Sequence, residues 1–222
     1  MSDSDWFVQL TPYVWLPSVE TSSRSVGALP PMETQTDLLD VLDVAAEAAL
    51  EVRKNRVFLL LDLSYVDLSG SQGFDGVVFD KGETEVSGIL GSANLGYRVI
   101  EEDPFIVDLM AGVQVVSLEI DLDFKGAVPA SASTSDTLID PIVGARARLN
   151  LGSGFFLNAI GDIGGGVDSK LTWQAMGTVG WQANDWLAFQ LGYRHLEIDF
   201  KDSSIMENLT LTGPIFGASF RL

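Results

Sequence analysis

Apolar and polar side chains alternate with a period of two along most of this chain. The longest alternating stretch is the segment 169–200, SKLTWQAMGTVGWQANDWLAFQLGYRHLEIDF, whose two runs are joined by the polar turn Ala183-Asn184-Asp185. Successive side chains of a β-strand point to opposite faces, so this segment predicts a hairpin with one apolar face. In the first strand that face is formed by Leu171, Trp173, Ala175, Gly177, Val179 and Trp181.

The spacing of the tryptophans on this face favours a membrane-spanning strand. Trp173 and Trp181 lie at opposite ends of the run. At ~3.3 Å per residue and a strong tilt, their separation approximates the height of a bilayer's hydrocarbon layer. A hairpin alone would leave backbone N–H and C=O groups unpaired in lipid, so the hairpin is expected to belong to a closed barrel.

The rest of the chain supplies further alternating runs separated by turn residues. The predicted strands are 6–16, 44–53, 56–69, 83–98, 105–124, 138–151, 155–164, 169–182, 186–200 and 207–222. In 105–124 the apolar phase changes past Ser117, which predicts either a bulge or the point where the strand leaves the membrane. The predicted fold is all-β, a closed antiparallel up-and-down transmembrane β-barrel of about ten strands, within a range of eight to twelve. Nothing marks an internal boundary, so residues 1–222 are expected to form one domain.

The links between these strands alternate in length. Those at 54–55, 101–104, 152–154 and 183–185 are short, whereas those after the first, third and fifth strands are long and acidic. Outer-membrane barrels show this sidedness, with short periplasmic turns and longer external loops, and an even strand count puts both termini on the periplasmic side. The longest link, 17–43, is interpreted as an extracellular loop or lid, and helical apolar spacing over 37–44 predicts a short amphipathic helix within it.

Composition agrees with a membrane barrel and excludes other classes. Hydrophobic residues make up 46% of the 222 residues and the mean hydropathy is +0.23, yet no run of ~18 apolar residues predicts a transmembrane helix. A net charge of -18 argues against nucleic acid as a partner, because phosphates would be repelled. Cysteine is absent, which excludes disulfides and thiolate metal sites. The first residues, MSDSD, lack the features of a secretory signal, so an exported protein would have its signal peptide absent from this chain.

One face of the strands is polar and is expected to line the lumen. By parity it carries Glu47, Glu51, Arg53, Asp62, Asn94, Arg98, Asp108, Gln114, Asp140, Arg146, Arg148, Asn158, Asp162, Gln174, Gln190 and Arg194. Acids and bases nearly balance there, and charges in a narrow lumen must pair or be solvated. These residues therefore predict either a salt-bridge network that fills the barrel or a water-filled, weakly selective passage.

Aromatic residues fall near the two ends of the predicted strands. We expect them to form membrane-interface girdles, which would comprise Trp6, Tyr65, Tyr97, Phe105, Phe155, Trp173, Trp181, Trp186, Tyr193 and Phe220. A soluble barrel built from the same alternation is the competing interpretation. It would leave an apolar face rich in glycine and alanine to fill the core, so the girdles and the loop asymmetry favour the membrane.

Several segments carry a family resemblance. LTPYVWLP (10–17), DLSYVDLS (62–69), LGYRV (95–99), DPIVGARARL (140–149), GDIGGGVDSKLTWQA (161–175), LGYRHLEIDF (191–200) and LTGPIFGASFRL (211–222) resemble a group of poorly characterised Gram-negative outer-membrane β-barrel proteins of the small, porin-like kind. The resemblance spans nearly the whole chain. It implies an outer-membrane architecture and carries no catalytic motif. The closing strand also resembles the signal read by the outer-membrane assembly machinery, except that its aromatic is Phe220 and the last residue is Leu222.

Two further features suggest chemistry. His195, the only histidine, stands near Glu197 and Asp199, and outer-membrane proteases of the omptin type place acids and a histidine at the outer rim. Parity puts His195 on the outward face with no nucleophile at a recognisable spacing, so no catalytic residue is predicted. The acidic segments 75–83 and 119–123 match no strict metal-ligand spacing, and no metal site is predicted. A weaker hypothesis is that divalent cations tie them to lipopolysaccharide phosphates.

The sequence thus predicts a small, non-enzymatic outer-membrane barrel with a passive pore or structural role, a charged lumen and acidic external loops. It needs no cofactor, and its expected partners are the lipid bilayer, lipopolysaccharide and the outer-membrane assembly machinery. The alternative from another class is a surface enzyme, either protease or lipid-modifying, or a ligand-binding receptor that acts through the loops.

Overall fold

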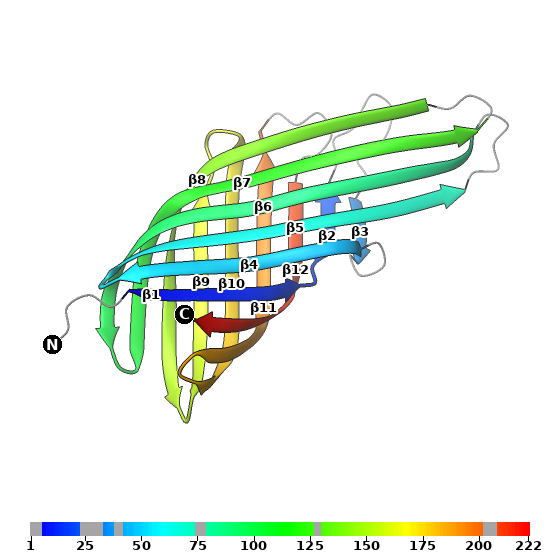
Figure 1. The fold of residues 1–222 in the computed structure, drawn as a ribbon. Coiled ribbons are helices and arrows are strands. Elements are labelled where there is room, and N and C mark those ends of the chain that lie inside the picture. Colours follow the sequence, from blue (N-terminus) through cyan, green and yellow to red (C-terminus); the bar gives the residue numbers. More distant parts are fainter. Residues whose placement is uncertain (1–5, 23–32, 38–41, 74–78, 127–129, 202–207) are drawn as a thin grey trace.

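The computed structural model describes residues 6–22, 33–37, 42–73, 79–126, 130–201 and 208–222, and in these it is all-β (Figure 1). Its strands are β1 (Phe7–Trp15), β2 (Ser18–Ser22), β3 (Glu33–Asp37), β4 (Leu42–Lys54), β5 (Val57–Gly73), β6 (Phe79–Glu102), β7 (Phe105–Gly126), β8 (Ala130–Gly152), β9 (Phe155–Gly164), β10 (Ser169–Asn184), β11 (Leu187–Phe200) and β12 (Asn208–Arg221). No helix among the described residues is long and apolar enough to cross a membrane.

Ten of these strands close into an up-and-down barrel. β4 to β12 pair antiparallel in chain order, and β1 pairs with both β4 and β12, for example Leu10 with Leu50 and Leu10 with Phe220. Closure removes the free sheet edges that lipid cannot satisfy. The turns at 55–56, 103–104, 153–154 and 185–186 lie at one end, here called the short-turn end, and the opposite end is called the long-loop end. The predicted ten-stranded barrel is confirmed.

The long link after β1 contains a hairpin that the sequence did not predict. β2 continues along β12 where β1 stops, pairing Ser18 with Thr212, and β3 pairs back onto β2. Pro17 interrupts the two pieces, since proline cannot donate to the ladder. Part of the expected helix, residues 38–41, lies outside the described residues. Of its remaining residues, Asp37 ends β3 and Leu42–Val44 begin β4, so they are strand.

The strands β5 to β8 are longer than the alternation predicted. β6 begins at Phe79, β7 ends at Gly126 and β8 begins at Ala130, so much of the expected loops at 70–82 and 125–137 is paired strand. Figure 1 shows these four strands extending well beyond the others at the long-loop end. β7 pairs with β8 without a register shift through Ser117, so the phase change there is not a bulge.

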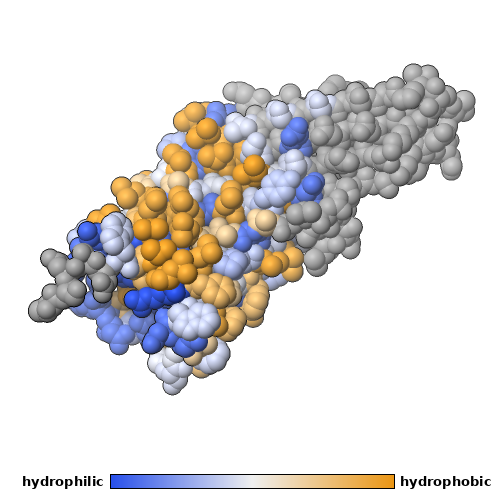
Figure 2. Space-filling view, viewed as in Figure 1, coloured by the Kyte–Doolittle hydropathy of each residue, from blue (hydrophilic) through white to orange (hydrophobic). Residues whose placement is uncertain are grey.

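The outer wall is apolar over the half nearest the short-turn end. Large exposed side chains include Leu59, Leu95, Val143, Leu191 and Phe216, each at least 40% exposed. Figure 2 shows apolar side chains gathered in a broad zone across the strands on one face, with polar groups at the short-turn end. Exposed apolar surface of this extent on alternating strand positions is what a lipid-facing wall requires.

Towards the long-loop end, the inner and outer faces of the wall exchange polarity. On β11 the outward residues run Phe189, Leu191, Tyr193, His195, Glu197 and Asp199, while the inward residues run Gln190, Gly192, Arg194, Leu196, Ile198 and Phe200. β12 changes at the neighbouring level, where outward Phe216 gives way to Thr212. A wall that is polar outside and apolar inside suits water. The pattern fits a barrel that continues past the membrane layer at the long-loop end.

Candidate functional site

The interior holds a cavity of about 540 Å³ in the half of the barrel nearest the short turns. Its lining includes the turn residues Asp185 and Trp186 and the exposed Arg221, so its mouth lies at the short-turn end. Tyr13 and Arg194 line its deep end.

The sixteen residues predicted to line the lumen all lie on the inner side, buried or half-buried. Thirteen of them line this cavity, namely Glu51, Arg53, Asp62, Asn94, Arg98, Asp108, Arg146, Arg148, Asn158, Asp162, Gln174, Gln190 and Arg194. The other three, Glu47, Gln114 and Asp140, are buried beyond it towards the long-loop end.

One wall of the cavity is a network of arginines around two carboxylates. Asp108, which is 1% exposed, accepts from Arg98 Nε at 2.9 Å and from Arg146 Nη2 at 2.7 Å. Glu51 accepts from Arg146 Nη1 at 2.7 Å and lies 3.4 Å from Arg53 Nε. Arg146 thus bridges both acids with its fork, a geometry for which guanidinium is better suited than ammonium.

Two phenylalanine rings stack against arginines of this wall. The Phe58 ring lies over Gly96, where a Cβ would come within 2.0 Å of it, and Arg146 stacks at 4.8 Å from the ring centroid. Phe156 repeats the arrangement on the adjacent part of the wall, over Gly180 and under Arg148. Glycine is required at both positions because any side chain would occupy the ring's place.

Arg148 differs from the other arginines of this wall. Its Nε donates to Asn150 Oδ1 at 3.1 Å and its guanidinium stacks on Phe156 at 3.6 Å. Within the described part of the chain it has no ion pair with a carboxylate and its two terminal nitrogens have no hydrogen bond. Arg148 therefore presents a free fork of donors to the cavity.

The part of the wall around Gln190, formed by β9 to β12, is neutral and polar. Gln190 accepts from Asn158 Nδ2 at 2.9 Å and from Thr178 Oγ1 at 3.2 Å, and donates to Ser219 Oγ at 2.8 Å. Ser219 shares a hydrogen bond of 2.8 Å with Thr11. Amides and hydroxyls thus face the charged wall across the cavity.

The deep end is closed by a second polar cluster. Arg194 donates to Asp62 Oδ1 at 3.2 Å and to Gln174 Oε1 at 2.8 Å, and Tyr13 donates to the same Asp62 carboxylate at 3.1 Å. Gln174 in turn donates to Asp162 Oδ2 at 2.7 Å. Asp162 Oδ1 is buried without a hydrogen-bond partner.

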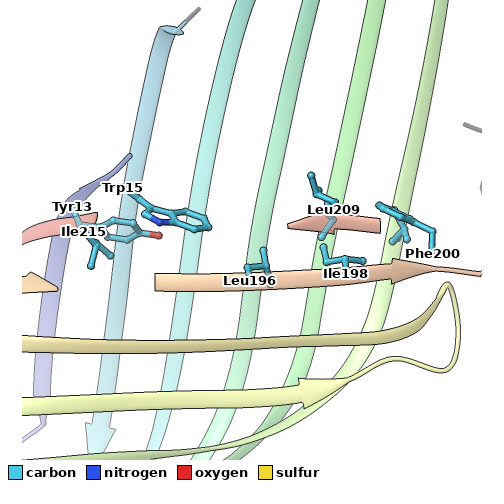
Figure 3. Packing of buried hydrophobic residues seen from close by; sticks show 9 residues of the cluster. Tyr13, Trp15, Leu196, Ile198, Phe200, Leu209 and Ile215 are labelled. Atoms are coloured by element: carbon cyan, nitrogen blue, oxygen red, sulfur yellow. The ribbon is translucent and has the colours of Figure 1, made fainter. Parts of the chain in front are cut away.

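Beyond this cluster an apolar plug fills the interior. Its members are Tyr13, Trp15, Val116, Leu138, Leu196, Ile198, Phe200, Leu209 and Ile215. Figure 3 shows Leu196, Ile198 and Phe200 on one strand with Leu209 beside them. The plug draws on β1, β11 and β12 and on β7 and β8 across the barrel, so it crosses the lumen.

The three predicted residues outside the cavity have structural partners. Glu47 accepts from Ser64 Oγ at 2.7 Å and from the backbone N–H of Trp15. Gln114 accepts from Thr172 at 3.2 Å. Asp140 Oδ1 accepts the backbone N–H groups of residues 167–169 and so anchors the link between β9 and β10.

His195 lies on the outer wall, apart from the cavity. Its Nδ1 is 2.6 Å from Thr212 Oγ1 and its ring lies 4.6 Å from that of Trp173. Trp173 donates from Nε1 to Glu197 at 3.1 Å. Among the described residues, no group of three or more His, Cys, Asp or Glu could hold a metal ion.

The residues predicted as girdles divide by position. Trp6, Tyr97, Phe105, Phe155, Trp181, Trp186 and Tyr193 are exposed, and Tyr65, Trp173 and Phe220 are half-buried. Trp173 pairs in register with Glu197, above the level of Tyr193, so it lies among polar groups. Trp186 lines the cavity mouth and stacks with Phe220 at 6.2 Å.

Sequence reasoning missed several lining residues. Tyr13, Phe156, Thr178 and Ser219 all face inward in the contacts above, yet they were not assigned to the lumen. Parity could have found them, since Tyr13 shares the phase of Gln9 and Thr11 on the first strand. The plug was also missed, although the change of apolar phase at Ser117 indicated that the inner face of that strand becomes apolar.

No family model matches the sequence, and no curated protein matches it. Among solved structures, the chain is similar to the outer membrane protease OmpT from Escherichia coli, with a TM-score of 0.66 and 9% identity over 97% of each chain. It is also similar to the translocator domain of the autotransporter NalP from Neisseria meningitidis, with a TM-score of 0.48 and 12% identity over 98% of this chain and 88% of that one. The likeness to OmpT shows the fold, that of an outer-membrane β-barrel.

Proposed function

We propose that this protein is a non-enzymatic outer-membrane barrel whose lumen is closed, with a structural rather than a freely conducting role. The observation that carries the proposal is the apolar plug, which joins opposite walls above the cavity. An apolar, close-packed layer has no hydrogen-bonding partners for water or ions, so hydrated ions would not cross it.

The polar layers below the plug favour the same conclusion. Asp108 and Arg194 each engage two or more partners across strands, which ties the wall together. Breaking one member would leave an uncompensated buried charge, so the network resists opening. Both arrangements fit a barrel that is rigid across its lumen.

The test is single-channel conductance of the detergent-refolded protein in a planar bilayer. We expect no discrete steps from the folded wild type, with folding checked by its heat-modifiable mobility. The paired variant Trp15→Ala with Leu196→Ala removes apolar bulk from the plug, and any conductance is expected there first. Steps from the wild type whose ion selectivity shifts in Arg146→Ala and Arg148→Ala would overturn the closed barrel.

A passive pore is the second candidate, and the cavity itself favours it. About 540 Å³ of charged, polar space already leads inward from the short-turn end, so a displaced plug would connect it to the other side. Wild-type conductance in the same bilayer experiment is the result that would select this candidate.

The proposed partners beyond the lipid follow from the closing strand. β12 presents Phe216, Ala218 and Phe220 at alternate positions before Leu222, which resembles a signal for the outer-membrane assembly machinery. Replacing Phe220 with Ala is expected to reduce the amount of protein inserted in cells. The same variant should still refold in detergent if recognition alone is affected.

A further inference from the structure

The cavity wall around Arg148 carries more positive charge than it compensates. Arg53, Arg98, Arg146 and Arg148 line this wall, and the carboxylates that they contact are Glu51 and Asp108 within the cavity and the exposed Glu101 at the rim. Arg148 is the member without a carboxylate within the described part of the chain, and its terminal nitrogens are free. A half-buried arginine in this state favours an anion, which its fork can hold in a bidentate manner.

The surroundings of Arg148 define the rest of a ligand. Asn158 lies opposite Arg148 in register, and Thr178 and Gln190 follow it on the neutral wall, so hydroxyl groups would find both donors and acceptors. Phe156 lies beneath Arg148 with 2% of its surface exposed, and Trp186 stands at the mouth of the cavity. The neutral amides and hydroxyl groups form a surface suited to a polyhydroxylated molecule, because they can fix its orientation.

A second group marks the deep end of the same space. Asp162 is 6% exposed, lines the cavity, and has an Oδ1 atom without a hydrogen-bond partner. It lies on β9 with Asn158, four residues deeper and therefore ~13 Å further along the strand. That oxygen is itself shielded from the cavity, so Asp162 marks the closed deep limit of the space and is not a contact for the ligand.

We infer that the cavity binds a small hydroxylated organic anion, a sugar acid or sugar phosphate, that enters from the short-turn end. Its carboxylate or phosphate is held by Arg148, and its hydroxyl groups lie along Asn158, Thr178 and Gln190. The volume of about 540 Å³ lies within the range of small-molecule sites. The site is blind because the Arg194 cluster and the apolar plug close its deep end, so it binds without requiring transport.

The test is a titration of the full chain, refolded in a detergent without a sugar headgroup, followed by calorimetry and by tryptophan fluorescence. The probes are gluconate, glucose 6-phosphate, glucosamine 6-phosphate and neutral glucose, each to about 10 mM, a concentration that largely occupies even a millimolar site. We expect saturable binding of at least one of the three probes with an anionic group and at least tenfold weaker binding of glucose. Comparing gluconate with the phosphates separates the carboxylate from the phosphate.

Variants locate the site. Arg148→Gln is expected to lower the affinity for the probe at least tenfold. Arg56 is an exposed arginine at the same end and outside the cavity lining, so Arg56→Gln is expected to leave that affinity unchanged. Folded wild type that binds none of the probes, or Arg148→Gln that binds as tightly as wild type, would overturn the inference. The binding result does not depend on whether the barrel conducts ions, so this inference and the proposed closed lumen can fail separately.

Discussion

The guanidinium of Arg148 lies 3.6 Å from the centre of the Phe156 ring, and the opposite face of that ring lies against Gly180. A cation over an aromatic face is attracted by the ring's quadrupole, worth about 0.5–2 kcal/mol depending on desolvation. The glycine, the ring and the arginine come from three strands, β10, β9 and β8, so the stack fixes their inner faces relative to one another. Phe58 makes the same stack between Gly96 and Arg146.

The first prediction concerns the glycine beneath that ring. A Cβ at position 180 would lie 2.2 Å from ring atoms of Phe156, so Gly180→Ala must displace the ring and the arginine above it. We expect it to lower the free energy of unfolding by about 1–3 kcal/mol. The matched control on the same strand is Gly177→Ala, whose Cβ would meet nothing within 4 Å. Urea unfolding in lipid vesicles measures both, and equal losses would contradict the packing described here.

Much of this barrel was accessible from sequence because its signals are local. Alternation and turn chemistry, such as that of 152–154, depend on neighbouring residues, and they gave all ten barrel strands in order. The hairpin of β2 and β3 escaped because SVETS and ETQTD carry no apolar alternation and pair only through the edge of β12. The upper parts of β5 to β8 escaped for a related reason, since Gly70 to Gly73 and Ser131 to Ser135 are rich in residues typical of loops.

The sequence predicts which face of each strand carries the site residues, but it does not predict which residues pair with one another. Parity alone decides that Arg146 and Arg148 point inward. It does not decide that Arg146 takes both Asp108 and Glu51 while Arg148 takes neither, because that depends on register across β4, β7 and β8. The plug likewise depends on contacts across the barrel, between residues of β7 and β8 in the middle of the chain and residues of β1, β11 and β12 near its ends.

The second prediction tests the arginine network. Asp108→Asn keeps the shape of the side chain but removes the charge that Arg98 and Arg146 share. Two arginines would remain in a buried wall with reduced compensation, so we expect a loss of roughly 3–5 kcal/mol in unfolding free energy. Glu101→Gln is the control, because the Glu101 carboxylate that pairs with Arg98 is exposed and the pair is worth no more than about 1 kcal/mol. If both variants unfolded at the same urea concentration, the network would not contribute as described.

The third prediction tests where the wall leaves the membrane. Val143 and Ser135 both point outward on β8 and are exposed, but Val143 lies in the apolar zone and Ser135 beyond it. Val143→Arg is expected to cost about 2–4 kcal/mol in lipid vesicles, and Ser135→Arg close to nothing. The two costs differ only when lipid surrounds the barrel, so they are measured by urea-dependent refolding into lipid vesicles. A comparable cost at Ser135 would place lipid around the upper wall as well.

The last prediction concerns the link between β9 and β10. Asp140 Oδ1 lies 3.2–3.3 Å from the backbone nitrogens of Val167, Asp168 and Ser169 and accepts a hydrogen bond from each. Asp140→Ala removes the acceptor, so the link is expected to open and to be cleaved several-fold faster by a protease that cuts before apolar residues such as Val167. Asp140→Asn retains one acceptor oxygen, so its cleavage rate is expected to fall between those of the wild type and Asp140→Ala. This comparison separates loss of the hydrogen bonds from loss of charge. Limited proteolysis of the refolded barrel followed by mass spectrometry gives the site and the rate. Unchanged cleavage in Asp140→Ala would mean that the β-ladder, and not this carboxylate, holds the link.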